Sequence, residues 1–378
     1  MRPELYVGLM SGTSADGIEA ALVAIDAAGI ALRHAYYTQF SPALRDEIHA
    51  LARGDYRAAD AIDALGALDA RLGEAFAAAA LAVVAEAGIE TGAVRAIGSH
   101  GQTIRHRPEG AAPFTLQIGD PHIIAARTGI TTVADFRRRD IALGGQGAPL
   151  TPAFHQAAFA APGEARAVLN LGGIANLTLL EPGREVRGFD VGPANTLLDA
   201  WATRHGDGTF DKDGALALAG KVHEPLLEAL LADAYFRRPP PKSSGPEHFN
   251  LEWLDAALAG IGGAPPPADV QATLVALTAT TVAHDLTAHA PAVKRLYVCG
   301  GGVHNPALMD ALAAALPAVA VASTATLGVD PDYVEAMAFA WLAHATLNGA
   351  PGNLPAVTGA RAPAPLGAII PSGAQQED

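Results

Sequence analysis

Short apolar runs separated by glycine-rich turns dominate the start of the chain. Residues 5–10 and 18–25 are apolar, residues 11–17 between them have the composition of a turn, and a further run covers 30–40. Such runs bounded by turns predict three strands joined as a meander. Ser41 followed by Pro42 then predicts a helix start, because serine caps helices and proline suits the first helical position.

The same arrangement recurs about 160 residues later. Residues 166–171, 177–180 and 185–190 predict three more strands, with turns at 172–176 and 181–183. Helical patterns and further short strands follow each meander. Residues 237–245, with three consecutive prolines, predict an extended linker or surface loop. A late strand ends in a triple glycine, after which Asn305 and Pro306 predict another helix start. We therefore expect an α/β fold built from two similar modules, each a mixed sheet covered by helices.

Composition narrows the functional classes. Only 17% of the 378 residues are charged, and the formal net charge is −14. This acidic excess disfavours binding to nucleic acid or to an anionic membrane. The longest apolar run, residues 75–85, is too short to cross a bilayer and fits a buried alanine-rich helix. Cys299 is the only cysteine, which favours a reducing compartment, so we expect a cytoplasmic protein.

Three glycine-rich turns follow predicted strands, at residues 12–17, 172–176 and 300–302. Such turns present backbone N–H groups that suit phosphate oxygens, and Asp16 in the first turn could hold a hydrated Mg²⁺. Ordinary hairpins also need glycine at these places, so the pattern leaves both interpretations open. The chain has neither a Walker A loop nor a G-x-S-x-G nucleophile elbow.

Two acidic residues are candidates for acid–base chemistry. Asp190 follows the third strand of the second module, a position that suits a general base, although it could equally cap the next helix. Glu335 lies early in a helix that Asp330 and Pro331 would start. There it could face a ligand or only interact favourably with the helix dipole.

Polar segments in the middle of the chain suit recognition of a small polar molecule. Residues 137–139 are all arginine and are flanked by Asp135 and Asp140. Three neighbouring arginines cannot all face one ligand, so we expect at least one to pair with an acid while another could bind an anion. Surface loops would have a similar composition. The other polar segments are residues 99–103, 115–120 and 144–149.

Longer motifs spread over nearly the whole chain resemble those of one known family. They are GLMSGTSADG (8–17), SHGQT (99–103), TLQIGD (115–120), DFRRRDIALGGQGAPL (135–150), NLGGIAN (170–176), FDVGPAN (189–195), VCGGG (298–302) and LPAVTGA (354–360). On these motifs the chain resembles the anhydro-N-acetylmuramic acid kinases of bacterial cell-wall recycling.

The resemblance implies the two-lobed fold shared by actin, Hsp70 and sugar kinases, with ATP between the lobes. It implies that water opens the 1,6-anhydro ring of 1,6-anhydro-N-acetylmuramic acid while O6 is phosphorylated, giving N-acetylmuramic acid 6-phosphate and ADP. ATP and Mg²⁺ are the implied cofactors, and the sugar and water the implied partners. Neither a nucleic acid nor a membrane is expected, and a homodimer is left open.

The resemblance also implies roles for individual residues. Asp190 would be the catalytic base, Glu335 a second residue of the active cleft, and Asp16 a neighbour of Mg²⁺. The expected nucleotide contacts are Gly12, Thr13, Ser14, Ala15, Asp16, Gly17, Ile18, Glu19, Gly172, Gly173, Asn176, Gly300, Gly301 and Gly302. The expected sugar contacts are His100, Gln117, Asp120, Arg137 and Gln146.

We expect an N-terminal lobe of residues 1–132 and 346–378, holding the phosphate-binding hairpin and the sugar-contacting loops. Residues 133–345 would form a C-terminal lobe with the catalytic aspartate and the adenosine side. Some positions differ from the usual family pattern: Val191 removes a hydroxyl beside the expected base, and His304 alters the adenine side. Ala15 and Glu19 are milder departures.

Two other functions fit the same motifs. In an ordinary hexose or amino-sugar kinase, Asp190 would deprotonate a free 6-hydroxyl. A non-catalytic ATP-driven switch or sugar-responsive regulator could also use this fold.

Overall fold

The chain folds into two compact units. The structure is a computed structural model that describes residues 3–12, 14–206, 208–245, 247–263 and 265–373. The first unit comprises Met1–Phe154 and Tyr333–Asp378, and the second comprises His155–Asp332. These bounds differ from those of the expected lobes, because residues 133–154 and 333–345 lie in the first unit.

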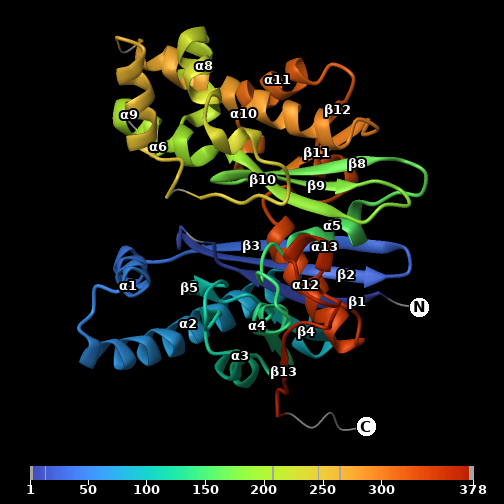
Figure 1. The fold of residues 1–378 in the computed structure, drawn as a ribbon. Helices are drawn as coiled ribbons and strands as arrows, with labels where there is room; N and C mark the ends of the chain where they lie inside the picture. Colours follow the sequence, from blue (N-terminus) through green and yellow to red (C-terminus); the bar gives the residue numbers. More distant parts are fainter. Residues whose placement is uncertain (1–2, 13, 207, 246, 264, 374–378) are drawn as a thin grey trace. The chain divides into compact units, whose positions relative to one another are not determined.

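Each unit contains one mixed sheet (Figure 1). The first has the strand order β13-β7-β4-β1-β2-β3, and the second has the order β10-β9-β8-β11-β12. A separate hairpin is formed by β5 and β6. The strands are β1 Glu4–Met10, β2 Gly17–Asp26, β3 Gly29–Gln39, β4 Val94–Ser99, β5 Gln102–Arg107, β6 Phe114–Ile118, β7 Thr132–Ala134, β8 Arg166–Leu171, β9 Ile174–Leu180, β10 Arg187–Pro193, β11 Arg295–Cys299, β12 Ala320–Ser323 and β13 Ala368–Ile370.

The two sheets repeat one pattern. In the first, β1, β2 and β3 form an antiparallel meander, and β4 then adds to β1 in parallel, followed by β7. In the second, β8, β9 and β10 form the meander, and β11 and β12 add in parallel beside β8. The predicted α/β class with two meander-first modules is thus confirmed.

Helices occupy most of the remaining described chain. The α-helices are α1 Pro42–Arg53, α2 Ala58–Glu86, α3 Pro121–Thr128, α4 Arg138–Ala142, α5 Thr151–Phe159, α6 Asn195–His205, α7 Ala215–Ala219, α8 Glu224–Leu231, α9 Leu251–Gly260, α10 Pro267–His289, α11 Pro306–Ala315, α12 Val334–Leu347 and α13 Pro355–Thr358. The 3₁₀-helices are η1 Thr91–Ala93, η2 Lys212–Gly214, η3 Ala234–Arg237, η4 Gly301–His304 and η5 Thr324–Leu327.

Helix starts were predicted well where a cap and a proline coincide. The Ser41 side chain accepts a hydrogen bond from the Leu44 amide at the start of α1, and Asn305 caps α11 in the same way. The prediction for α12 was wrong: this helix begins at Val334, with no side-chain cap, and Asp330 accepts from the Asp332 amide instead.

Helices α2 and α12 cover opposite faces of the first sheet. Val7 and Leu9 belong to the apolar core that includes residues of α2. Because neighbouring strand residues point to opposite faces, Gly8 faces the other helix. A Cβ atom at Gly8 would collide with the Ala336 carbonyl, and one at Gly98 would collide with the Phe339 carbonyl. These two glycines therefore allow α12 to lie directly on β1 and β4.

Candidate functional site

The turn between β1 and β2 is held from inside the first unit by Gln102. The Ser11 hydroxyl donates to Gln102 Oε1 (2.6 Å), and Gln102 Nε2 donates to the Gly12 carbonyl (3.1 Å). Ala15 adopts a positive φ of 53° and is fully buried. Gln102 thus fixes the start of the turn at Ser11 and Gly12.

The predicted phosphate-binding residues divide into exposed and buried groups. Ser14 and Asp16 are exposed, and a Cβ at Gly12 would meet only the Ser14 hydroxyl, at 4.0 Å. In contrast, Gly17 and Ile18 are buried with Ala15, and Glu19 is partly buried. Thr13 lies outside the described residues.

Asp16 offers an accessible carboxylate at the outer end of this turn. Its side chain is 53% exposed, and its Oδ1 lies 3.4 Å from Arg45 Nη1. Mg²⁺ in nucleotide sites keeps several waters and commonly uses one or two carboxylates together with phosphate oxygens, so an exposed carboxylate beside an open glycine turn fits this ion. The described residues contain no group of three or more His, Cys, Asp or Glu side chains that could hold a metal by themselves.

In the second unit, four side chains on neighbouring strands form a row across the sheet, and two of them, Asp190 and Asn176, were predicted as site residues. Asp190 on β10 pairs with Asn176 on β9, Asn176 pairs with Asn170 on β8, and Asn170 pairs with Cys299 on β11. Residues directly opposite on neighbouring strands project from the same face of a sheet. Asn170 was not predicted as a site residue, although it begins the NLGGIAN motif.

The glycine turns of the second unit lie at one end of this row. The Gly172 carbonyl accepts from the Asn195 amide and the Gly173 carbonyl from the Thr196 amide (both 3.1 Å), which fixes the β8–β9 turn to the start of α6. Gly300 has φ 81°, and a Cβ there would collide with Asn170 Oδ1. Gly301 is exposed and Gly302 is buried against Leu171. The sequence placed Asn176 in a turn, but β9 begins at Ile174 and includes it.

A β-bulge displaces the strand at Asp190. In the pairing of β10 with β9, the register shifts between Asp190 and Gly192, so Val191 is the extra residue. Bulges of this kind re-aim side chains and are common next to active sites. The Val191 side chain is fully buried in the core of the second unit. The hydroxyl that the family usually has at this position would therefore be buried in this chain.

Asp190 is a partly buried carboxylate with one amide donor. Its Oδ2 accepts from the Ser244 amide (3.1 Å). Burial raises the pKa of Asp190 to about 6; the Ser244 amide lowers the pKa and the charge of Glu247 raises it further. The alternative role as a helix cap is excluded, because α6 begins at Asn195 after Ala194 and has no side-chain cap. The geometry is that of a carboxylate held ready to accept a proton.

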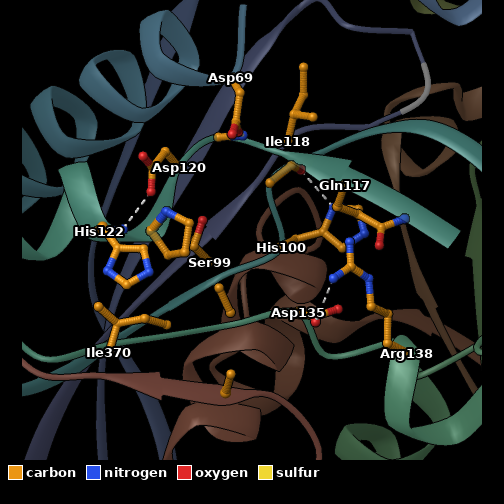
Figure 2. Close-up of a pocket in the computed structure, with 15 residues that line it drawn as sticks. Asp69, Ser99, His100, Gln117, Ile118, Asp120, His122, Asp135, Arg138 and Ile370 are labelled. Carbon is orange, nitrogen blue, oxygen red and sulfur yellow. Dashed lines mark hydrogen bonds and ion pairs between the residues drawn. The ribbon is translucent and has the colours of Figure 1, made fainter. Parts of the chain in front are cut away.

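A cavity of about 470 Å³ lies within the first unit (Figure 2). His100, Gln117 and Asp120, all predicted as sugar contacts, are among its lining residues. Gln117 Nε2 donates to the hydroxyls of Thr103 (3.1 Å) and Thr115 (2.8 Å). Asp120 also caps α3 by accepting from the His122 amide (2.8 Å). The cavity thus gathers three of the five predicted sugar contacts.

Arg137, the fourth predicted sugar contact, is held by His100 and by the backbone. Its Nε and Nη2 lie 3.0 and 2.9 Å from His100 Nε2, and its Nη1 donates to the Gly147 carbonyl (2.8 Å). His100 Nδ1 faces the Gly101 carbonyl (2.8 Å). Burial and the charge of Arg137 hold the pKa of His100 well below its usual value. The neutral imidazole therefore accepts from the guanidinium, which keeps its charge.

The other two arginines of the cluster, Arg138 and Arg139, confirm part of the prediction made from the sequence. Arg138 pairs with Asp135 at 3.4 Å, which confirms that one arginine of the cluster is neutralised by a neighbouring acid. Arg139 donates to the Pro365 carbonyl (3.2 Å). Gln146, the fifth predicted sugar contact, is exposed on the loop that follows.

The fully buried Asp140 fixes that loop, a role that the sequence reasoning missed. The carboxylate accepts from the Gly147 amide, the Asn353 amide nitrogen and the Thr358 hydroxyl, each at 2.7 Å. The acid was visible in the sequence, but two of its three partners, Asn353 and Thr358, lie more than two hundred positions away. Only the resemblance of residues 354–360 to a family motif indicated that this segment matters.

Glu335 lies in the first turn of α12, at the helix that covers Gly8 and Gly98. Burial raises the pKa of Glu335, while the positive charge of Arg137 opposes this rise. A first-turn position suits both interpretations of Glu335, an interaction with the helix dipole and a contact with a ligand. His304, the family departure after the triple glycine, pairs with Asp332 at 2.8 Å.

No helix in the described part of the chain combines the length and the apolar character that a membrane crossing requires.

A family model and related proteins both match nearly the whole chain. The model of the anhydro-N-acetylmuramic acid kinase family matches residues 4–372. The anhydro-N-acetylmuramic acid kinase of Xylella fastidiosa is 57% identical over 371 residues, covering 97% of this chain and 96% of that protein. The protein of the same name from Xanthomonas campestris is 58% identical over 372 residues, covering 97% of each.

Among solved structures, the activator of 2-hydroxyisocaproyl-CoA dehydratase from Clostridium difficile has a TM-score of 0.45 at 9% identity, covering 89% of this chain and 92% of that one. This likeness is too low to carry an argument. The family match and the two relatives over nearly the full length are decisive. The chain is an enzyme and belongs to the anhydro-N-acetylmuramic acid kinase family.

Proposed function

We propose that this enzyme uses ATP and water to convert 1,6-anhydro-N-acetylmuramic acid into N-acetylmuramic acid 6-phosphate and ADP, in the recycling of cell-wall sugars. The oxygen of water bonds to C1 while Asp190 accepts a proton from that water. The C1–O6 bond breaks, and O6 takes the γ-phosphoryl group as the bond to ADP breaks. An anhydro sugar has no free 6-hydroxyl, so ring opening must accompany the transfer.

The observation that carries this proposal is the placement of Asp190. Its carboxylate is partly buried at a strand bulge, level with Asn176, and among the described residues it accepts from one amide, that of Ser244. A pKa of about 6 leaves the group ionised at neutral pH while keeping it basic enough to take a proton. A carboxylate that only stabilised the fold would be expected to have more donors, as Asp140 has.

We assign the nucleotide phosphates to the open turn at Gly12, Ser14 and Asp16. Bound Mg²⁺ would neutralise charge on the phosphates, with Asp16 as its protein ligand. The accessible glycines of the second unit, Gly172, Gly173 and Gly301, would approach the nucleotide through the backbone. Asn176 would contact it beside Asp190. The buried residues of the first turn, Ala15, Gly17 and Ile18, would maintain its shape.

We assign the sugar to His100, Gln117 and Asp120, with Gln146 at the loop beside them. Arg137 is the proposed partner of the lactyl carboxylate. Three of the five N–H groups of its guanidinium face His100 and Gly147, which leaves two for a bidentate contact with a carboxylate. Glu335 would act in the same cleft, where its charge is balanced by Arg137.

A comparison of acceptors tests the proposed reaction. ADP release is measured with no sugar, with 1,6-anhydro-N-acetylmuramic acid, and with N-acetylmuramic acid, which has a free 6-hydroxyl. The proposal predicts release only with the anhydro sugar. Faster release with the free 6-hydroxyl would instead indicate an ordinary amino-sugar kinase, and release that no sugar changes would indicate an ATP-driven switch.

A further inference from the structure

The segment between η3 and α9 is anchored by a buried ion pair. The sequence predicted an exposed connector over residues 237–245, because three consecutive prolines stand in it. Lys242 contradicts this: its Nζ lies 2.8 Å from Asp285 Oδ2 on α10, and the two side chains are 2% and 3% exposed. The aromatic ring of Tyr235 lies 5.1 Å from the same Nζ.

The anchored segment and the neighbouring η3 form hydrogen bonds with three groups of Asp190: its amide, its carboxylate and its carbonyl. The Asp190 amide donates to the Lys242 carbonyl (3.0 Å), and the Ser244 amide donates to the Asp190 carboxylate (3.1 Å). The Tyr235 hydroxyl donates to the Asp190 carbonyl (2.9 Å). Because β10 is the edge strand of its sheet, the Lys242 carbonyl and the Tyr235 hydroxyl satisfy the backbone amide and carbonyl of Asp190 that no neighbouring strand could reach.

A buried lysine–aspartate pair attaches this loop at a large desolvation cost. Removing two charges from water costs more than an apolar contact of the same size, so such pairs often contribute geometry rather than stability. An apolar side chain at position 242 could pack against α10 without this desolvation cost. The ion pair instead fixes the position of one backbone stretch with respect to a helix, and that stretch carries the only amide donor seen on the Asp190 carboxylate among the described residues.

We propose that the Lys242–Asp285 ion pair is a positioning device for Asp190, which holds the Ser244 amide against the reacting carboxylate. This inference rests on the proposed role of Asp190 as the base. Lys242 and Asp285 do not touch the substrate; they act through the backbone of residues 242–244.

The charged groups around Asp190 determine what the loss of this anchor does. The charge of Glu247 raises the pKa of Asp190, and the Ser244 amide lowers it. Tyr235 is a further titratable neighbour that interacts with both Asp190 and Asp285, and Lys242 pairs with Asp285. If the Ser244 amide moves away, burial and Glu247 act unopposed. The carboxylate then ionises at a higher pH, and it is less well aimed at water.

The test compares Lys242→Met with a control variant on β10, the strand that carries Asp190. Lys242→Met is expected to lower kcat at least tenfold and to leave the KM for ATP unchanged. The acid limb of kcat is expected to move about one unit to higher pH, the value of a hydrogen bond to a charged group. The control, Arg187→Met, removes the ion pair with Glu181 (2.6 Å) and the hydrogen bond to the His289 carbonyl (2.7 Å) at the start of β10, and it leaves the Lys242–Asp285 pair in place. It is expected to keep the wild-type pH profile.

A double variant covers the case in which Lys242→Met does not fold. Lys242→Met/Asp285→Leu removes both charges, which restores folding where a single unpaired charge prevents it. The proposal predicts a displaced acid limb and a lowered kcat in the double variant as well. A folded double variant with the wild-type kcat and pH profile would overturn it. The variant Asp190→Asn separates the two proposals: if it stays active, the role of Asp190 itself fails, whatever Lys242 does.

Discussion

The connection between the first two strands of the meander differs between the two units. In the first unit, six residues, 11–16, join β1 to β2, whereas two residues, Gly172 and Gly173, join β8 to β9 in the second. The long turn is held from inside by Gln102 and keeps Ser14 and Asp16 exposed. The short turn uses its carbonyls to fix the start of α6.

The third strands of the two meanders differ as well. β3 carries a bulge of its own, with Arg33 as the extra residue in its pairing with β2, but this strand contains no Asp or Glu. The bulge of β10 lies at Asp190, and residues 242–244 form hydrogen bonds with that residue. The repeated meander is thus modified at different connections in the two units.

The largest expected effect comes from the second unit. Asp190→Asn should lower kcat by about three orders of magnitude, as expected when a general base is lost, with little change in the KM for ATP. Steady-state kinetics of ADP release check this. Asp199→Asn is a matched control, since burial also raises the pKa of Asp199 to about 6 but the residue lies on α6 outside the site. Retention of more than a tenth of the rate by Asp190→Asn would remove it as the base.

The next effect belongs to the sugar side of the first unit. Arg137→Met should raise the KM for the anhydro sugar by about 10- to 100-fold, the value of one charge-assisted contact, and leave the KM for ATP unchanged. Arg139→Met is the control, because the exposed Arg139 only donates to the Pro365 carbonyl. Equal changes in both KM values would show that Arg137 supports the fold rather than the carboxylate.

A smaller effect is expected at the long turn. Gly12→Ala should raise the KM for ATP by about tenfold, since a methyl group would stand where phosphate approaches the backbone. The added Cβ meets no other described residue closer than 4.0 Å, so the melting temperature should not change. Gly66→Ala on α2, where a Cβ meets nothing within 4 Å, is the control for the KM, which it should leave unchanged. Its melting temperature should rise slightly, because alanine favours a helix interior over glycine. An unchanged KM for Gly12→Ala would place the phosphates elsewhere.

The smallest effect concerns stability. The folded pKa of Asp190, about 6, lies above the ordinary value of 3.8, so ionisation destabilises the folded state as pH rises through this interval. Asp190→Asn removes that cost and should stabilise the protein at pH 7 by about 1–3 kcal/mol. Thermal unfolding at several pH values checks this: the advantage should shrink toward zero below pH 4. An equal advantage at all pH values would show that the charge of Asp190 is not its cause.

Sequence patterns predicted the features that local chemistry determines. The strands of both meanders and the helix starts at Ser41 and Asn305 depend on neighbouring residues only, and they were found. The bulge at Asp190, the buried Lys242 and the pairing of Arg137 with His100 depend on contacts between distant segments. No spacing rule encodes such contacts. The three prolines before Lys242 even favoured the opposite interpretation, an exposed connector.

Isotope labelling tests the central claim, that water deprotonated by Asp190 opens the sugar ring as O6 is phosphorylated. The enzyme is supplied with ATP and 1,6-anhydro-N-acetylmuramic acid in ¹⁸O-labelled water, and the product is analysed by mass spectrometry. Preformed N-acetylmuramic acid 6-phosphate in the same water corrects for exchange at C1. The account predicts one ¹⁸O at C1 and none in the transferred phosphoryl group. A product that is unlabelled at C1 beyond the exchange control would contradict it.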